Sequence, residues 1–134
     1  MNIKEEGTQP ISTEQEIVLA RQSCRKLAQD CGLRIVAQTK LVTAVSELAR
    51  NTLVYGGGGD MHWQKLEDGL RQGIRITFSD EGPGIPDLQL AMTDGWTSGS
   101  GLGLGLTGAK RLVNEFEIDT TPGKGTRISI TQWS

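Results

Sequence analysis

Two polar side chains in the segment SELARN, residues 46–51, have the spacing of a chemical pair. Glu47 and Asn51 are four residues apart, so on a helix they share one face. An amide oxygen such as that of Asn51 is a hard ligand that suits Mg²⁺, and a carboxylate one turn away can accept a proton from an attacking hydroxyl or water. A solvated pair on an amphipathic helix has the same spacing, because this face is nearly opposite the apolar one.

A second candidate site is the segment DEGPGI, residues 80–85, which follows a strongly alternating strand pattern. Asp, Gly and Pro favour turns wherever they occur, so a plain turn explains this composition. A base-binding site explains it as well: Asp80 accepts a hydrogen bond from a base edge, while Gly82 and Gly84 let a flat ring approach the backbone. The segment GKGT, residues 123–126, has the composition of a hairpin turn.

Glycines occupy alternate positions of GSGLGLGLTGAKRL, residues 99–112, directly before a helical pattern. Glycine costs about 1 kcal/mol against alanine inside a helix, so this placement favours a function, such as bringing backbone N–H groups close to a phosphate. The dinucleotide fingerprint does not fit, because no convincing strand precedes it and too little chain follows for a second βαβ unit. A Walker A loop needs Gly-Lys-Ser/Thr, whereas Ala109 follows Gly108, and the HRD and DFG motifs of eukaryotic-type kinases are absent.

These segments lie on alternating helix and strand patterns. Ser12 and Thr13 precede Glu16 at capping-box spacing, which predicts where the first helix begins. Residues 1–8 are polar and predict a flexible N-terminus, and residues 9–134 predict a single domain. The expected elements are an edge strand beginning at about 9–12, helices over about 13–31, 35–55 and 104–115, and strands over about 61–69, 73–80, 116–120 and 126–133. This order predicts an α+β two-layer sandwich, in which a mixed, largely antiparallel sheet has helices on one face.

The composition of the chain excludes several classes of function. Its 134 residues suffice for one hydrophobic core, and a net charge of −2 gives no basic excess for binding nucleic acid. No apolar run resembles a signal peptide or a membrane span, which predicts a cytoplasmic protein without a membrane partner. Cys24 and Cys31 are expected to be buried free thiols. His62 is the only histidine, which excludes a His-based triad and a multi-His metal site.

Taken together and in order, the motifs ELxxN, DxGxGI, GxGLGL and GxGT resemble those of the GHKL nucleotide-binding superfamily, named for gyrase, a heat-shock chaperone, histidine kinases and a mismatch-repair protein. The resemblance covers about residues 9–133. Within the superfamily, SELARN, DEGPGIPD, GLGLGLTGAKRL and EFEIDTTPGKGT resemble the small serine-protein kinases of bacterial partner-switching systems, which include the stressosome switch kinase and the anti-sigma factor kinases. The resemblance implies the Bergerat ATP-binding fold, with ATP and Mg²⁺ as cofactors.

The resemblance also implies a role for each matching residue. Glu47 is the catalytic base, Asn51 is the Mg²⁺ ligand, and Asp80 binds the adenine amino group. Thr126 helps to hold a water network beside the adenine. The alternate glycines form a lid over the phosphates, and the helix from Leu104 presents its N-terminal N–H groups to the triphosphate. The implied nucleotide-binding residues are Asn51, Asp80, Gly82, Gly84, Ile85, Gly99, Gly101, Leu102, Gly103, Leu104, Gly105 and Thr126.

The function implied by the resemblance is an ATP- and Mg²⁺-dependent serine-protein kinase. Its substrate is a STAS-domain protein, with a phosphatase or a sigma factor as a further partner, and it acts as a switch in a bacterial stress or sigma-factor pathway. The alternative is a nucleotide-gated binding module, such as an anti-sigma factor that sequesters its partner with little or no catalysis. The complete pair of Glu47 and Asn51 favours catalysis, because a binding module does not need Glu47.

Overall fold

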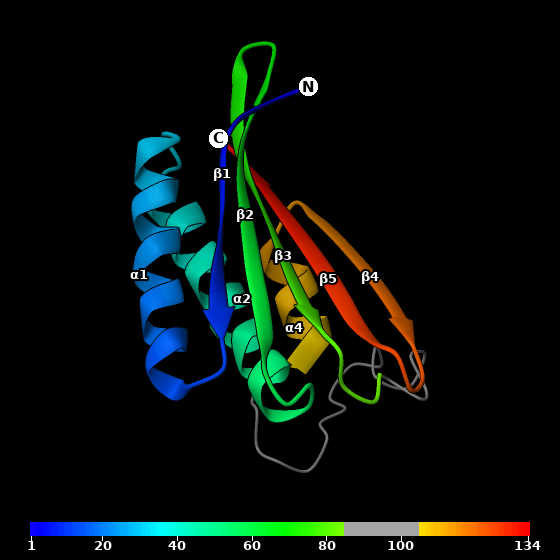
Figure 1. Ribbon diagram of the computed structural model, residues 1–134. Helices are drawn as coiled ribbons and strands as arrows, with labels where there is room; N and C mark the ends of the chain where they lie inside the picture. Colours follow the sequence, from blue (N-terminus) through cyan, green and yellow to red (C-terminus); the bar gives the residue numbers. More distant parts are fainter. Residues whose placement is uncertain (85–104) are drawn as a thin grey trace.

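The computed structural model describes residues 1–84 and 105–134, and in this part of the chain three helices cover one face of a five-stranded sheet (Figure 1). The sheet has the order β1-β2-β3-β5-β4. The elements are β1 (Asn2–Ile11), α1 (Glu14–Asp30), α2 (Ile35–Val54), β2 (Gly59–Asp68), β3 (Arg71–Asp80), α4 (Gly105–Leu112), β4 (Glu115–Thr121) and β5 (Gly125–Trp133).

The predicted α+β two-layer sandwich and the predicted order of its elements are confirmed. The expectation of a mixed sheet is wrong for the described residues, because all four strand pairings are antiparallel. The sheet is antiparallel throughout because of the position of β5. Strand β4 runs in the same direction as β3, but β5 lies between them and pairs antiparallel with both.

The first helix begins and ends where the sequence predicts. The Oγ1 atom of Thr13 accepts the backbone N–H of Glu16 at 3.1 Å, and Glu16 Oε1 in turn accepts the backbone N–H of Ser12 at 2.8 Å. These two bonds satisfy backbone donors that a helix start leaves unpaired. At the other end, Gly32 has a φ of +76°, a conformation that glycine adopts without strain.

Helix α4 is shorter than the predicted helix over 104–115, because it ends at Leu112 and Glu115 already belongs to β4. Asn114 lies in the turn between α4 and β4. Its backbone N–H donates to Gln132 Oε1 at 2.9 Å, and its own Oδ1 accepts the backbone N–H of Trp133 at 2.8 Å. An asparagine side chain that bonds to the backbone in this way competes with continuation of the helix.

The core lies between the sheet and the helices. Ile74, Ile76 and Phe78 of β3 are buried at alternate positions, as the strand pattern predicts. Cys24 and Cys31 are buried free thiols, which confirms that prediction, and burial raises the pKa of the Cys24 thiol to about 12. None of the described helices is long and apolar enough to cross a lipid bilayer. Other core residues include Ile17, Ala20, Leu41, Val45, Leu48, Met61, Ile128 and Ile130.

The prediction of a flexible segment over residues 1–8 is wrong, because β1 begins at Asn2 and pairs with β2 along its length. His62 of β2 helps to hold this edge strand. Its Nδ1 lies 2.9 Å from Thr8 Oγ1, and its Nε2 lies 2.8 Å from Glu6 Oε1. The strand is mostly exposed, so it lacks the apolar alternation by which a half-buried strand is recognised.

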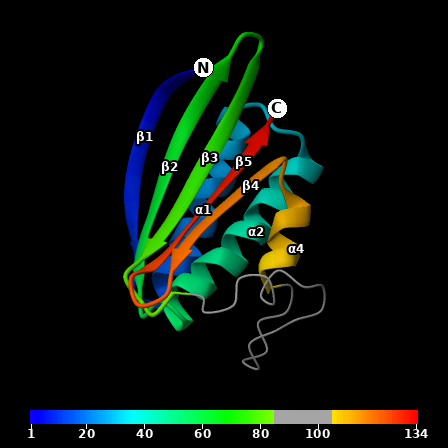
Figure 2. The same cartoon turned by 90° about the vertical axis from the view of Figure 1, so that its right-hand side faces the viewer.

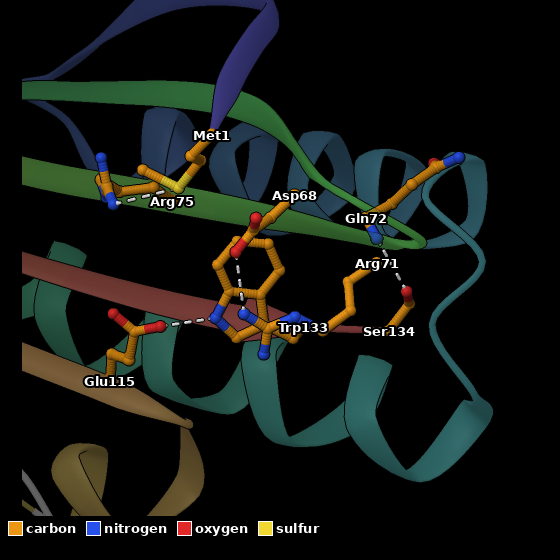
Figure 3. Close-up of polar contacts among 8 residues, drawn as sticks. All are labelled: Met1, Asp68, Arg71, Gln72, Arg75, Glu115, Trp133 and Ser134. Atoms are coloured by element: carbon orange, nitrogen blue, oxygen red, sulfur yellow. Dashed lines mark hydrogen bonds and ion pairs between the residues drawn. The ribbon is translucent and has the colours of Figure 1, made fainter.

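Trp133, the last residue of β5, packs on the sheet in a cluster of polar contacts (Figure 3). The Arg71 guanidinium lies 4.1 Å from the centre of the indole ring and also pairs with Asp68 at 3.1 Å. The indole N–H donates to the Glu115 carboxylate. The ring lies so close to Gly73 that a Cβ at that position would be 2.6 Å from its Cε3 atom. Trp133 is therefore a packing residue.

We expect Gly73→Ala to lower the free energy of unfolding by about 1 kcal/mol, because the new methyl group displaces the indole from the Arg71 guanidinium. Urea-induced unfolding measures the change. In a Trp133→Ala background the same substitution should be neutral or stabilising. A loss of equal size in both backgrounds would show that contact with Trp133 is not the reason for the glycine.

The ends of α2 and β3 and the turn between β4 and β5 lie together at one end of the molecule (Figures 1 and 2). Both chain termini lie at the opposite end. The predicted site residues in the described part of the chain lie on these elements or at the start of α4.

Candidate nucleotide site

The C-terminal half of α2 carries the predicted pair Glu47 and Asn51, and both residues are partly buried. The backbone carbonyl of Asn51 accepts the N–H of Tyr55 at 2.9 Å and that of Gly56 at 3.3 Å. These bonds close the end of the helix. The second bond also fixes the position of Gly56 directly after the helix.

Gly56 connects this helix end to the second motif. A Cβ at position 56 would lie 2.4 Å from Cγ of Asp80, and a Cβ on Gly82 would lie 2.7 Å from the Gly56 Cα. The Oδ1 atom of Asp80 accepts the Gly82 N–H at 2.9 Å, which orients the carboxylate. The sequence patterns did not predict this role of Gly56. The available signal was a glycine run that directly follows the ELxxN helix.

Strand β5 borders the other side of Asp80. Thr126 is the cross-strand partner of Asp80, and its Oγ1 lies 2.9 Å from the Oγ1 of Thr120. Gly125 has a φ of +112°, and a Cβ there would lie 2.1 Å from the Asp80 carbonyl oxygen. Any larger side chain at this position would push β5 away from the end of β3. The second glycine of the GxGT motif is therefore required by close packing, beyond what a hairpin turn needs.

The loop that contains Gly84 rests on the turn between β4 and β5. The Pro83 carbonyl accepts the backbone N–H of Gly123 at 2.7 Å. Gly84 has a φ of +75°, and a Cβ there would lie 2.5 Å from the carbonyl oxygen of Thr121. Both glycines of the DxGxG motif thus allow a close approach of two backbone segments.

A cavity of about 630 Å³ opens at this end of the sheet, within the size range of small-molecule sites. It includes Asp80 and Thr126 but neither Glu47 nor Asn51, so it contains one part of the predicted site. Ser79 also lines the cavity. Because Phe78, the preceding residue of β3, faces the core, Ser79 faces the side of the sheet without helices, and the cavity extends toward that side. The lining residues are Gly58, Gly59, Asp60, Ser79, Asp80, Glu81, Asp119, Thr121, Lys124, Gly125, Thr126 and Arg127.

The surroundings of Glu47 differ from a solvated helix face, the alternative interpretation of the spacing, because α4 packs against α2. Its Oε2 atom is buried and has no hydrogen-bond partner among residues 1–84 and 105–134. Burial raises the pKa of the Glu47 carboxyl, and two weaker influences lower it: the positive charge of Arg50 and a hydrogen bond from the Gly105 N–H. Gly105 is the first residue of α4, so this N–H, which the sequence analysis assigned to the triphosphate, donates to Glu47 in the structure.

The raised pKa of Glu47 predicts a dependence of stability on pH. The folded protein disfavours the ionised carboxylate, so wild-type stability falls as the pH rises from the ordinary carboxyl value of 4.5 through the higher folded value. Glu47→Gln removes this charge, and we expect it to raise the melting temperature by a few degrees near neutral pH. The difference should disappear in acid, which calorimetry at both pH values measures. Equal melting temperatures at neutral pH would contradict a desolvated carboxylate.

The donors at this end of the molecule fit a nucleotide with its metal ion. Asp80 offers a carboxylate, which the Gly82 N–H already orients. In residues 1–84 and 105–134 no three His, Cys, Asp or Glu side chains gather as a metal cluster. An ion beside Asn51 would therefore take most of its ligands from phosphate and water, which is the usual mode of Mg²⁺.

Six of the predicted nucleotide-binding residues lie outside the described residues, and their assignment stays a prediction. The structure brings Asn51, Asp80, Gly82, Gly84 and Thr126 to one end of the molecule, and Gly105 contacts Glu47. The residues outside the described ranges are Ile85, Gly99, Gly101, Leu102, Gly103 and Leu104.

Comparisons with known proteins show which proteins the chain is similar to. Serine/threonine-protein kinase RsbT of Bacillus subtilis is 43% identical over 123 residues, which are 92% of this chain and 92% of that protein. An anti-sigma F factor of Bacillus licheniformis is 33% identical over 102 residues, which are 70% of this chain and 68% of that protein. A solved structure of the RsbU and RsbW domains of Rv1364c from Mycobacterium tuberculosis has a TM-score of 0.65 at 18% identity. It matches 96% of this chain and 32% of that longer one, and it supports the fold alone.

The profile of the family described as histidine kinase-, DNA gyrase B-, and HSP90-like ATPase matches residues 36–133. This match confirms the resemblance found in the sequence and implies the use of ATP. Together with the nearly full-length relative, it identifies a serine/threonine-protein kinase that acts as a regulatory switch in stress or sigma-factor signalling. The chain belongs to the histidine kinase-, DNA gyrase B- and HSP90-like ATPase family.

Proposed function

We propose that this kinase binds ATP and Mg²⁺ between the end of α2 and the adjoining ends of β3 and β5, and transfers the terminal phosphate to a serine of a small STAS-domain protein. The observation that supports this best is the contact of Gly56 with Asp80. It joins the helix that carries Glu47 and Asn51 to the strand end that offers an acceptor for a base.

The adenine lies on the side of Asp80 and Thr126 in this proposal. The Oδ1 atom of Asp80 already accepts the Gly82 N–H, so the orientation of the carboxylate is set before a base arrives. Its other oxygen accepts the adenine amino group. The hydroxyl of Thr126 orients water beside the ring.

The phosphates extend toward α2, where Asn51 and Glu47 have separate tasks. Asn51 supplies an oxygen ligand, and Mg²⁺ neutralises phosphate charge when bound. Glu47 accepts the proton of the substrate hydroxyl as the oxygen attacks the phosphorus. Partial burial suits this task, because a carboxyl with a raised pKa is a stronger base than one in water.

The proposed protein partner follows from the partner-switching kinases that the sequence resembles, and the names of the curated relatives, RsbT and anti-sigma F factor, support it. The test is incubation of the protein with γ-labelled ATP, Mg²⁺ and a STAS-domain protein encoded beside it in the genome. We expect labelled phosphoserine that disappears with a chelator, or when the acceptor serine is replaced by alanine. Complex formation without any phosphoserine would instead support the binding module.

A further inference from the structure

Arg50 lies on the same helix as the proposed base Glu47 and is not among the proposed catalytic or nucleotide-binding residues. It follows Glu47 by three residues on α2, which places the two side chains on the same side of the helix. Its Nη1 atom lies 3.0 Å from Oε1 of Glu14, the first residue of α1. A carboxylate of another helix therefore holds this guanidinium on the side of α2 that also carries Glu47.

The place of Glu14 is determined by the start of its helix. The capping bonds of Thr13 and Glu16 fix the first turn of α1, and α1 packs against α2. The two helices run in opposite directions, so the start of α1 lies beside the end of α2 (Figure 1). Glu14 thereby holds Arg50 from outside the helix that carries the base.

Stability alone does not explain this ion pair. The Glu14 side chain is 67% exposed and that of Arg50 is 38% exposed, and pairs of this kind contribute about 0–1 kcal/mol. Glu47, by contrast, is partly buried with an unpartnered Oε2 among the described residues, and the charge of Arg50 opposes the effect of this burial on its pKa.

We propose that Glu14 and Arg50 are positioning residues for phosphate transfer: Glu14 holds the guanidinium beside Glu47, and Arg50 keeps this carboxylate ionised and ready to accept a proton. This inference rests on the proposed role of Glu47 as base. Apart from the charge of Arg50, the polar group of the described residues that acts on Glu47 belongs to α4. The Gly105 N–H donates to it, while the charges of Lys110 and Arg111 lie in the last turn, away from Gly105.

The test follows the Glu47 carboxyl against pH by ¹³C NMR of glutamate-labelled protein, with the signal assigned by its loss in Glu47→Gln. Arg50→Met should move the titration midpoint to higher pH, and Arg50→Lys, which keeps the charge, should leave it near that of wild type. Glu14→Gln should cause a smaller shift in the same direction, because the released guanidinium spends time in water. It should add nothing in an Arg50→Met background, since Glu14 acts through Arg50.

Phosphate transfer gives the second readout. Arg50→Met should slow transfer relative to wild type at both pH values, and the loss at about pH 5.5 should be about 3–10-fold larger than the loss at about pH 8. A purely structural role would not produce this difference between the two pH values. The matched controls are Lys4→Met and Glu67→Gln, which break an exposed ion pair of 3.2 Å between β1 and β2. Both controls should leave the profile unchanged.

Two results would overturn the inference. One is an unchanged Glu47 midpoint in a folded Arg50→Met protein, and the other is a Glu14→Gln shift that persists without Arg50. The NMR titration needs no enzymatic turnover, so it decides the influence of the pair on Glu47 even if wild type forms no phosphoserine. Such a lack of phosphoserine would contradict the proposed function separately.

Discussion

Glu47→Ala is expected to slow phosphate transfer by about 10²–10⁴-fold while Mg·ATP binds with nearly unchanged affinity, the scale and signature of a lost general base. The structure supports this separation, because Glu47 lies one helical turn before Asn51 and contacts the start of α4. Glu47 acts on the hydroxyl proton, which belongs to the substrate protein. Removing its carboxylate therefore takes away an interaction of the transition state and leaves the nucleotide contacts in place.

Asn51→Ala is the contrasting variant, because it should weaken Mg·ATP binding and abolish transfer together. Calorimetric titration with an ATP analogue and phosphate transfer to the STAS-domain protein measure the two effects. Glu67→Ala, at a partly exposed glutamate of β2 in the exposed ion pair with Lys4, serves as the control and should change neither. Transfer at the wild-type rate in Glu47→Ala would show that Glu47 is not the base, even with the nucleotide site intact.

Asp80→Asn should weaken nucleotide binding by about 1.5–3 kcal/mol, or about 10–100-fold, the range for a hydrogen bond to a charged group. An amide flip can restore the contact with adenine only at the cost of the bond to the Gly82 N–H. If the amide oxygen accepts the Gly82 N–H, as Asp80 Oδ1 does now, the NH₂ group points at the adenine amino group and sets donor against donor. If the amide is reversed, NH₂ instead opposes the Gly82 N–H. Either orientation loses one bond.

Titration with an ATP analogue measures this loss, and Asp119→Asn is the matched control. Asp119 lines the same cavity, but its cross-strand partner in β5 is Arg127. The cross-strand partner of Thr126 in β4 is the next residue, Thr120, whose side chain lies on the helix side of the sheet. Replacement of Asp119 should leave the affinity unchanged. Equal affinities of wild type and Asp80→Asn would remove Asp80 from the adenine site.

Local patterns in the sequence were sufficient for the order of the elements and for most of their boundaries. The alternation of Ile74, Ile76 and Phe78 predicted a strand with one buried face, because successive side chains of a strand point to opposite faces. The capping residues Thr13 and Glu16 predicted the start of α1, because unpaired backbone donors need partners nearby in the chain. The spacing of the four motifs identified the family, which the profile match confirms.

Tertiary structure decided the features that depend on residues far apart in the chain. Residues 2–8 are a strand because β2 satisfies their backbone groups, although their own side chains show no apolar alternation. Gly56 belongs to the site because the end of β3 brings Asp80 against it. Glu47 is partly buried because α4 covers part of α2, and burial disfavours its charge. The periodicity of one segment does not specify which other segment packs on it, and that packing determines which carboxylate is desolvated and which cation lies beside it.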